Sequence, residues 1–143
     1  MVEETKNQEN KCSHLEILDE DPINKFEDML QKQKELQNAL GNNMDNLSDK
    51  EKVAKFKEWY ICIMAEFVET LDKLPWKEWK NYKTYELSKE ESLELEFELI
   101  DIFHFYMNIL LVFKVDPKRF YNLYNAKWKE NHDRIKRGYS KSK

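Results

Sequence analysis

Four acidic side chains stand in two closely spaced pairs within apolar stretches of the sequence. Glu66 and Glu69 are three residues apart, and so are Glu98 and Asp101. On an α-helix this spacing places both side chains of a pair on one face, one turn apart. Carboxylate oxygens are the ligands that hard divalent cations such as Mg²⁺ prefer. If the two helices pack together, the four acids predict a divalent metal site.

A solvated helix face is the competing interpretation of Glu66 and Glu69. They fall on the opposite side of their helix from its main apolar stripe, where exposed carboxylates normally lie. That stripe consists of Val53, Phe56, Tyr60, Ile63, Met64, Phe67, Leu71 and Leu74. The pair itself is surrounded by residues apolar enough to be covered as well, namely Trp59, Ile61, Cys62, Ala65 and Val68. The residue types alone leave both interpretations open.

An aromatic and basic segment, Trp76-Lys77-Glu78-Trp79-Lys80, follows Pro75. Its two indoles can simply close over a hydrophobic core. Alternatively, the segment suits a nucleotide, because a flat base or sugar packs against an indole while an ammonium group meets phosphate. Here too the residues by themselves do not choose between packing and binding.

The helix that carries Glu98 and Asp101 has one polar stripe and is otherwise apolar. The stripe comprises Glu94, Glu98, Asp101, Phe105, Asn108 and Val112. Such a helix has to be covered nearly all round, which requires a helical bundle and, in so small a domain, a partner subunit. His104 lies beside the stripe. We expect it to be a neighbour of the metal ligands, because hard cations prefer oxygen.

Signals at helix ends place these groups in an all-α fold. The chain has 2 glycines and 3 prolines, too few for the many tight turns of an all-β architecture. Capping boxes and cap-plus-proline pairs mark four helix starts. The expected helices are 22–40, after Asp21; 49–73 and 88–114, opened by boxes at Ser48 and Ser88; and 117–135, after Asp116. With a turn or short helix at 76–80, they predict a compact bundle of about five helices.

The first and last helices carry further polar groups. Gln33 and Gln37 lie close to the apolar face of the first helix, where amides are by default solvated. Lys127 and Arg134 belong to a basic C-terminal stretch. This stretch is either a fraying cationic helix end or a group of side chains that contact the phosphates of a ligand. The last helix is expected to turn four residues inward: Phe120, Leu123, Tyr124 and Trp128.

Length and composition predict a polar, disordered leader over residues 1–20 and one domain over 21–143. The 28 acidic and 24 basic residues make no general case for a nucleic acid or an anionic membrane as partner. The apolar run 102–113 is shorter than the roughly 20 residues of a bilayer span. Without a visible secretion signal or a CxxC pair, we expect a reducing, cytoplasmic setting.

Several segments together resemble the dimeric, all-α dUTPase family, which is related to MazG-like pyrophosphohydrolases and phage dCTP pyrophosphatases. The resemblance covers most of the chain from Phe26 onward. Its motifs are Met29-Leu30 with Gln33 to Leu36; Glu66 to Glu69 as E-x-x-E, followed by Trp76-Lys77 and Trp79-Lys80; Glu98 to Asp101 with Phe103-His104-Phe105; and Lys127, Asn131, Arg134, Gly138 and Tyr139. The segment between Asp101 and Lys127 is shorter than in longer members, which indicates a compact form.

The resemblance implies that the chain hydrolyses dUTP to dUMP and pyrophosphate, and dUDP as well. Glu66, Glu69, Glu98 and Asp101 would bind two or more Mg²⁺ ions. Glu69, supported by Glu66, would orient the attacking water and accept its proton. The residues expected to contact the deoxyuridine nucleotide are Gln33, Gln37, Trp76, Lys77, His104, Lys127, Asn131, Arg134 and Tyr139.

Two departures from the family pattern bear on the choice of base. Trp128 stands where an asparagine usually follows the lysine, and Gln37 where an asparagine is expected. A dCTP or broader dNTP pyrophosphohydrolase is therefore the alternative, because an amide can satisfy either pyrimidine by flipping. A non-catalytic helical interaction protein on the same scaffold is the alternative from a different class. The apolar breadth of the two long central helices predicts a homodimer.

Overall fold

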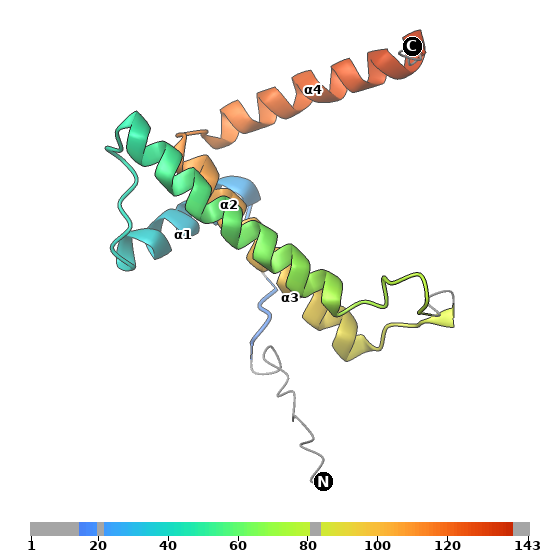
Figure 1. Ribbon diagram of the computed structural model, residues 1–143. Helices are drawn as coiled ribbons and strands as arrows, with labels where there is room; N and C mark the ends of the chain where they lie inside the picture. The colour runs from blue at the N-terminus through green and yellow to red at the C-terminus, as the bar shows by residue number, and fades with distance from the viewer. Residues whose placement is uncertain (1–14, 20–21, 81–83, 139–143) are drawn as a thin grey trace.

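The described part of the chain is all α-helical. The computed structural model describes residues 15–19, 22–80 and 84–138, and over these it has four helices and no strand (Figure 1). They are α1 (Lys25–Ala39), α2 (Asp49–Asp72), α3 (Lys89–Val112) and α4 (Pro117–Arg137). The predicted all-α class is confirmed. Of the two forms expected for residues 76–80, the turn is the one present, because these residues form bends and turns, and the described residues therefore have four helices where about five were expected.

Three of the four helices begin where the caps predict. The Ser48 and Ser88 hydroxyls accept from the N–H groups of Glu51 and Glu91, whose carboxylates accept in return from the serine N–H groups. Asp116 caps α4 by accepting from Arg119 N–H at 2.7 Å. Each such cap stabilises its helix by about 1 kcal/mol.

The first helix begins later than expected. We predicted that Pro22 would occupy its first position, but α1 starts at Lys25, and Asn24 makes no side-chain cap. Ile23, which lies between Pro22 and Asn24, is 99% exposed. A helix that began at Pro22 would therefore bury no further apolar side chain at this end. The predicted cap Asp21 lies outside the described residues. At the other end Gly41 stops the helix as expected, with a φ of 83° that favours glycine.

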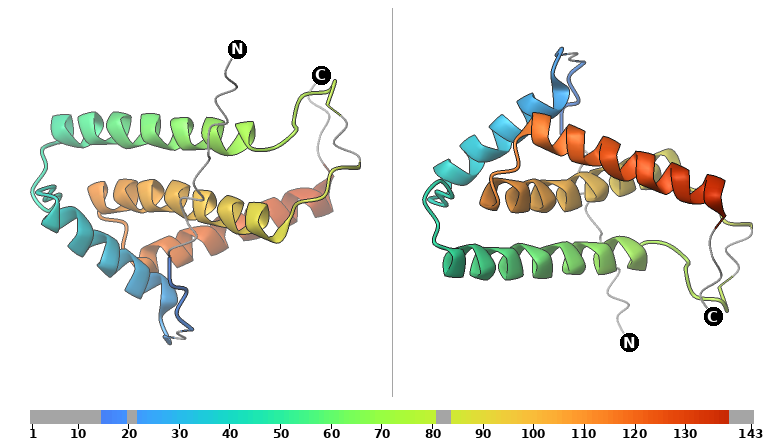
Figure 2. Two further views of the ribbon diagram at one scale, coloured as in Figure 1. Left: turned by 90° about the horizontal axis from the view of Figure 1, so that it is seen from below. Right: turned by 90° about the horizontal axis from the view of Figure 1, so that it is seen from above.

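Helices α2 and α3 lie antiparallel and side by side, and α1 packs on the C-terminal half of α3 (Figure 2). Two small apolar clusters hold this arrangement together. Leu30 of α1 packs between Met107 and Leu110 of α3. Trp59 of α2 packs with Val112 and with Met44 from the preceding loop. The antiparallel pairing brings the end of α2 close to the first half of α3.

The face that α2 turns toward α3 is not its main apolar stripe. Trp59 and Thr70 are its buried residues, with Cys62 and Glu66 half-buried near them. Most of the stripe is exposed in the single chain: Val53, Phe56, Tyr60, Met64, Phe67 and Leu71. One neighbouring helix can cover only one side of α2, so covering the stripe needs a further partner.

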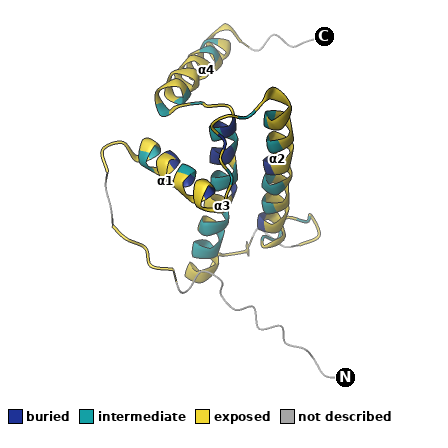
Figure 3. Ribbon diagram, turned by 90° about the vertical axis from the view of Figure 1, so that its left-hand side faces the viewer, coloured by how far each residue is buried: buried dark blue, intermediate teal, exposed yellow. Residues whose placement is uncertain are grey.

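Helix α4 projects away from α2 and α3 (Figure 1). It has no buried residue, so all of it is coloured exposed or intermediate in Figure 3. Only its first turn packs, where Phe120 stacks on Phe26 with 4.8 Å between ring centroids. The predicted inward positions of Leu123, Tyr124 and Trp128 are wrong for the single chain, in which these side chains are exposed. Among the described residues, none of the helices is both long and apolar enough to span a membrane.

Candidate metal centre

Three of the four predicted acids meet between α2 and α3. One carboxylate oxygen each from Glu66, Glu69 and Glu98 lies within 4.8 Å of the other two. In an octahedral Mg²⁺ site, neighbouring ligand oxygens are about 3.0 Å apart and opposite ones about 4.2 Å, because each Mg–O bond is about 2.1 Å. The three side chains would therefore have to draw closer together for one ion to touch all three. The donor set, all oxygen and anionic, fits a hard divalent cation.

The cluster is electrostatically unfavourable without a cation. Burial raises the pKa of Glu66, and the charges of Glu69, Glu98 and Asp101 raise it further, as does a hydrogen bond shared with Glu98. A raised carboxyl pKa means that the folded protein resists a negative charge at this position. Desolvation combined with like charges is the pattern that cation-binding and catalytic carboxylates show.

A lysine that the sequence motifs did not single out contacts the cluster. The Lys73 ammonium group forms an ion pair with Glu98, whose side chain is 15% exposed. Lys73 follows Glu66 by seven residues and Glu69 by four, so it belongs to the same face of α2. That spacing could have placed Lys73 beside Glu66 and Glu69 from the sequence, but its pairing with Glu98 could not be predicted in this way.

Asp101 stands slightly apart from the three glutamates. Its side chain is 56% exposed, and its nearer carboxylate oxygen lies 4.0 Å from Nδ1 of His104. It is not part of the group of three, although its charge contributes to the raised pKa of Glu66. Its role as a metal ligand, and that of His104 as a neighbour, stay predictions.

The segment after α2 forms a polar pocket beside the acidic cluster. Lys77 holds its ammonium group over the rings of Trp76 and Trp79, 5.8 and 5.3 Å from their centroids. Lys77 and Trp76 line a cavity of about 510 Å³ whose lining also includes Asp72, Lys73, Leu74, Pro75, Lys80 and Tyr85, but not Trp79. Lys73 thus lines the cavity and also contacts the acidic cluster, whereas the binding of a nucleotide by these residues stays a prediction.

Gln33 and Gln37 of α1 are buried, so the default expectation of solvated amides is wrong for these two, whereas Asn38, a third amide near the apolar face, is exposed as expected. Gln33 and Gln37 are 4% and 5% exposed. Gln33 donates from Nε2 to Oδ1 of Asn108 at 2.7 Å, and Gln37 accepts from Nδ2 of Asn42 at 3.0 Å. Both glutamines point toward the core because a polar partner meets each of them there. Asn108, on the predicted polar stripe, was not among the expected site residues.

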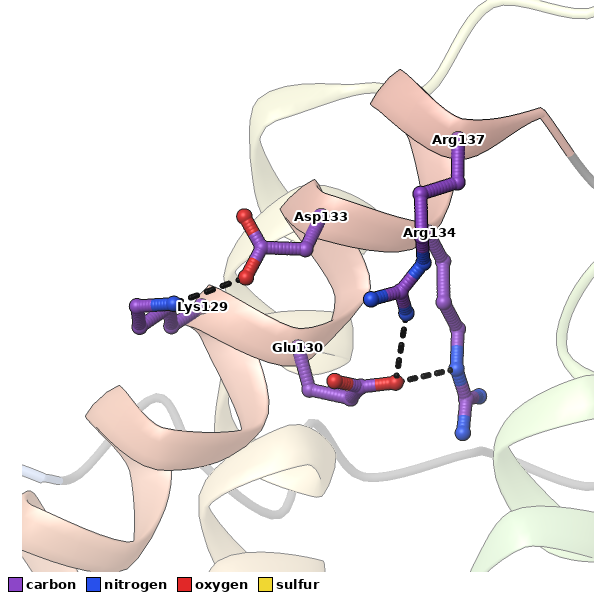
Figure 4. Close-up of polar contacts among 5 residues, drawn as sticks. All are labelled: Lys129, Glu130, Asp133, Arg134 and Arg137. Carbon is purple, nitrogen blue, oxygen red and sulfur yellow. Dashed lines mark hydrogen bonds and ion pairs between the residues drawn. The ribbon is translucent and has the colours of Figure 1, made fainter.

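The predicted phosphate contacts on α4 are not brought to the cluster within one chain. Lys127, Asn131 and Arg134 are exposed on the projecting part of the helix. Arg134 instead pairs with Glu130, 2.9 Å away, and Glu130 also accepts from Arg137 at 3.1 Å (Figure 4). Tyr139 lies outside the described residues. Any contact of these residues with a substrate stays a prediction.

Comparison with known proteins gives the family. The model of the dUTPase family matches residues 25–122, which include α1, α2, α3 and the start of α4. The chain therefore belongs to the all-α dimeric dUTPase family, as the motifs indicated.

The curated relatives that the chain matches are not named as dUTPases. The dCTP pyrophosphatases of Enterobacteria phages T4 and LZ5 are 32% and 35% identical over 106 residues, which are 74% of this chain and 53% of each phage protein. A DNA replication protein of phage T4 is 31% identical over 94 residues, 66% of this chain and 20% of that protein. The chain thus spans about half the length of the pyrophosphatases it matches. No solved structure matches it significantly.

Proposed function

We propose that this chain is a Mg²⁺-dependent pyrophosphohydrolase of deoxypyrimidine nucleoside triphosphates, with dUTP as its preferred substrate and dUDP as a second one. The observation that carries the proposal is the convergence of Glu66, Glu69 and Glu98 between two packed helices. Membership of the dUTPase family supports the same class of reaction. The products from dUTP are dUMP and pyrophosphate.

The residues of the cluster are proposed metal ligands, and Glu69 is also the proposed base. Glu66 and Glu98 are half-buried and Glu69 is exposed, so Glu69 has the best access to a water molecule from solvent. Bound Mg²⁺ would supply phosphate coordination and a water of lowered pKa. Glu69 orients that water and accepts its proton, which is the role of a general base. Asp101, close by and open to solvent, completes the proposed ligand set.

The cavity next to the cluster is the proposed site for the phosphate chain and sugar. Lys77 and Lys80 place positive charge there, and Trp76 offers a flat apolar surface. Ammonium groups aimed at phosphate oxygens stabilise the charge that develops during transfer. The acidic cluster and this basic cavity lie side by side, with Lys73 common to both, so a phosphate chain can contact the two together.

Base selectivity is the finer part of the proposal. Relatives named dCTP pyrophosphatase make dCTP the second candidate substrate. Gln33 and Gln37 are the proposed base-reading residues, and an amide can present either a donor or an acceptor. We favour dUTP because the matched family is that of dUTPases.

Hydrolysis of each dNTP, together with dUDP, in the presence of Mg²⁺ tests the proposal. We expect dUTP and dUDP to be turned over well ahead of dCTP, and no turnover with a chelator present. Equal rates for dUTP and dCTP would replace the dUTP assignment with a broader one. If the protein turns over no nucleotide, and calorimetry detects no binding of a non-hydrolysable dUTP analogue at millimolar Mg²⁺, the chain is a non-catalytic interaction protein.

We also propose that the active form is a homodimer. The exposed apolar stripe of α2 supports this, since Phe56, Met64 and Phe67 are 39 to 54% exposed along one face. Exposed patches of this kind mark interfaces. Light scattering at micromolar concentration is expected to give twice the mass of the chain, and Phe67→Asp to give the single mass. A wild-type monomer under these conditions contradicts the proposal.

A further inference from the structure

We propose that Lys73 is an exchangeable cation of the acidic cluster. In the metal-free protein its ammonium group neutralises Glu98. When a divalent ion binds, the ammonium group leaves Glu98 and turns into the adjacent cavity, where it binds substrate phosphate. This inference rests on the proposed function, because it assumes that the cluster binds a metal ion.

The first observation is the charge of the cluster. Three carboxylates converge within 4.8 Å, and the ion pair between Lys73 and Glu98 supplies a positive charge directly to this group. Glu98 is the more buried partner, with 15% of its side chain exposed against 39% for Lys73. A lysine on a flexible four-carbon stem can supply this charge and can also be withdrawn toward solvent.

The second observation is where the lysine can go. Lys73 also lines the cavity of about 510 Å³ that contains Trp76, Lys77, Lys80 and Tyr85. Lys77 is held there over two indole rings, so the cavity already has one fixed ammonium group. Two further lysines on its wall make it suited to a polyanion such as a triphosphate or pyrophosphate.

The two positions of Lys73 are linked by charge. A divalent cation that takes an oxygen of Glu98 competes with the ammonium group for that oxygen and repels it. A phosphate chain in the cavity attracts the same group. Metal and nucleotide therefore drive the side chain in one direction, and each is expected to favour binding of the other.

Titration calorimetry of Mg²⁺ into metal-free protein tests the first half of the exchange. Lys73→Met removes the positive charge that competes with Mg²⁺, so it is expected to tighten Mg²⁺ binding roughly three- to tenfold. This is the size of effect expected when one unit charge is removed a few ångströms from the metal ion near the protein surface. Lys73→Arg keeps the charge and pairs more firmly with a carboxylate, so its Mg²⁺ affinity should equal or fall below that of the wild type. The matched control is Lys52→Met, which removes an α2 lysine paired with Asp49 and should leave Mg²⁺ affinity unchanged.

Binding of pyrophosphate and of a non-hydrolysable dUTP analogue at saturating Mg²⁺ tests the second half. Lys73→Met is expected to bind both several-fold more weakly than the wild type and Lys52→Met, although it binds the metal more tightly. Opposite changes for metal and phosphate are the signature of exchange, which loss of folding cannot produce. If Lys73→Met binds Mg²⁺ and phosphate as the wild type does, the proposed role of Lys73 is overturned. The proposed function still stands in that case, provided that the wild type binds Mg²⁺. A wild type that does not bind Mg²⁺ overturns both.

Discussion

Helix α3 carries two polar regions with opposite character. Around the middle of α3, Glu98 and Asp101 approach the glutamates of α2, so like charges are brought together at the surface. Two turns further on, Asn108 meets Gln33 of α1 in the interior, where a neutral donor and acceptor bond at 2.7 Å. Asn108 is 1% exposed and Gln33 is 4% exposed.

The difference lies in what each region needs in order to be stable. The buried amides bond to each other and so help to hold α1 on α3 without a ligand, although Nδ2 of Asn108 has no hydrogen-bond partner among the described residues. The carboxylates share one hydrogen bond, between Glu66 and Glu98, but their charges repel one another, so a cation stabilises them, whether from Lys73 or from solution. A group of charges that the fold alone leaves unbalanced is the better candidate for function.

The largest effect is expected from changing the acidic region. Glu69→Gln keeps the size of the side chain but removes the proposed base, so turnover should fall by on the order of 10²-fold or more. The melting temperature of the metal-free protein should stay the same or rise, because one repelling charge is lost. Enzyme assays and thermal melts with and without Mg²⁺ measure both quantities.

Asp101→Asn, just outside the three-glutamate group, tests the same site with the fourth proposed ligand. It should also reduce the stabilisation that Mg²⁺ gives. A large loss of metal-free stability in either variant would instead indicate that these acids are parts of structural ion pairs, and the metal site would have to be withdrawn.

A smaller effect, measured here on stability, is expected from the amide region. Asn108→Leu leaves the Gln33 amide buried without a partner, which should lower the free energy of unfolding by about 1 to 3 kcal/mol. Adding Gln33→Leu should recover part of that loss, with a coupling energy of roughly 0.5 kcal/mol or more. Urea denaturation measures these values. Gln31→Leu, on the exposed face of α1, is the control, and strictly additive losses would show that the two amides act independently.

The smallest effect is a pH dependence of the metal-free protein. The pKa of Glu66 is raised above its ordinary value of 4.5 by burial and by Glu69, Glu98 and Asp101. The folded state therefore holds the proton longer than the unfolded state, and stability falls as pH rises from about 4.5 through the raised value. Glu66→Gln should melt higher than wild type above this window. Below pH 4.5 the difference should vanish, and a constant difference at every pH would contradict this account.

The sequence by itself determined where three of the helices begin and which acids share a face. Ser48, Ser88 and Asp116 set three helix starts through bonds within a few residues, which local order makes predictable. The E-x-x-E spacing put Glu66 and Glu69 on one face for the same reason. The family followed from motifs at fixed spacing, which the match over residues 25–122 confirmed.

Only the tertiary structure decided which faces meet. The sequence left open which face of α2 packs within the chain, and the structure places the face with Trp59 and Thr70 there, because burial depends on which neighbours the chain can supply and not on hydrophobicity alone. The burial of Gln33 required Asn108, 75 residues further along the chain, to supply a hydrogen-bond partner in the core. The pairing of Lys73 with Glu98 likewise joins two helices across 25 residues, a contact that no local pattern specifies.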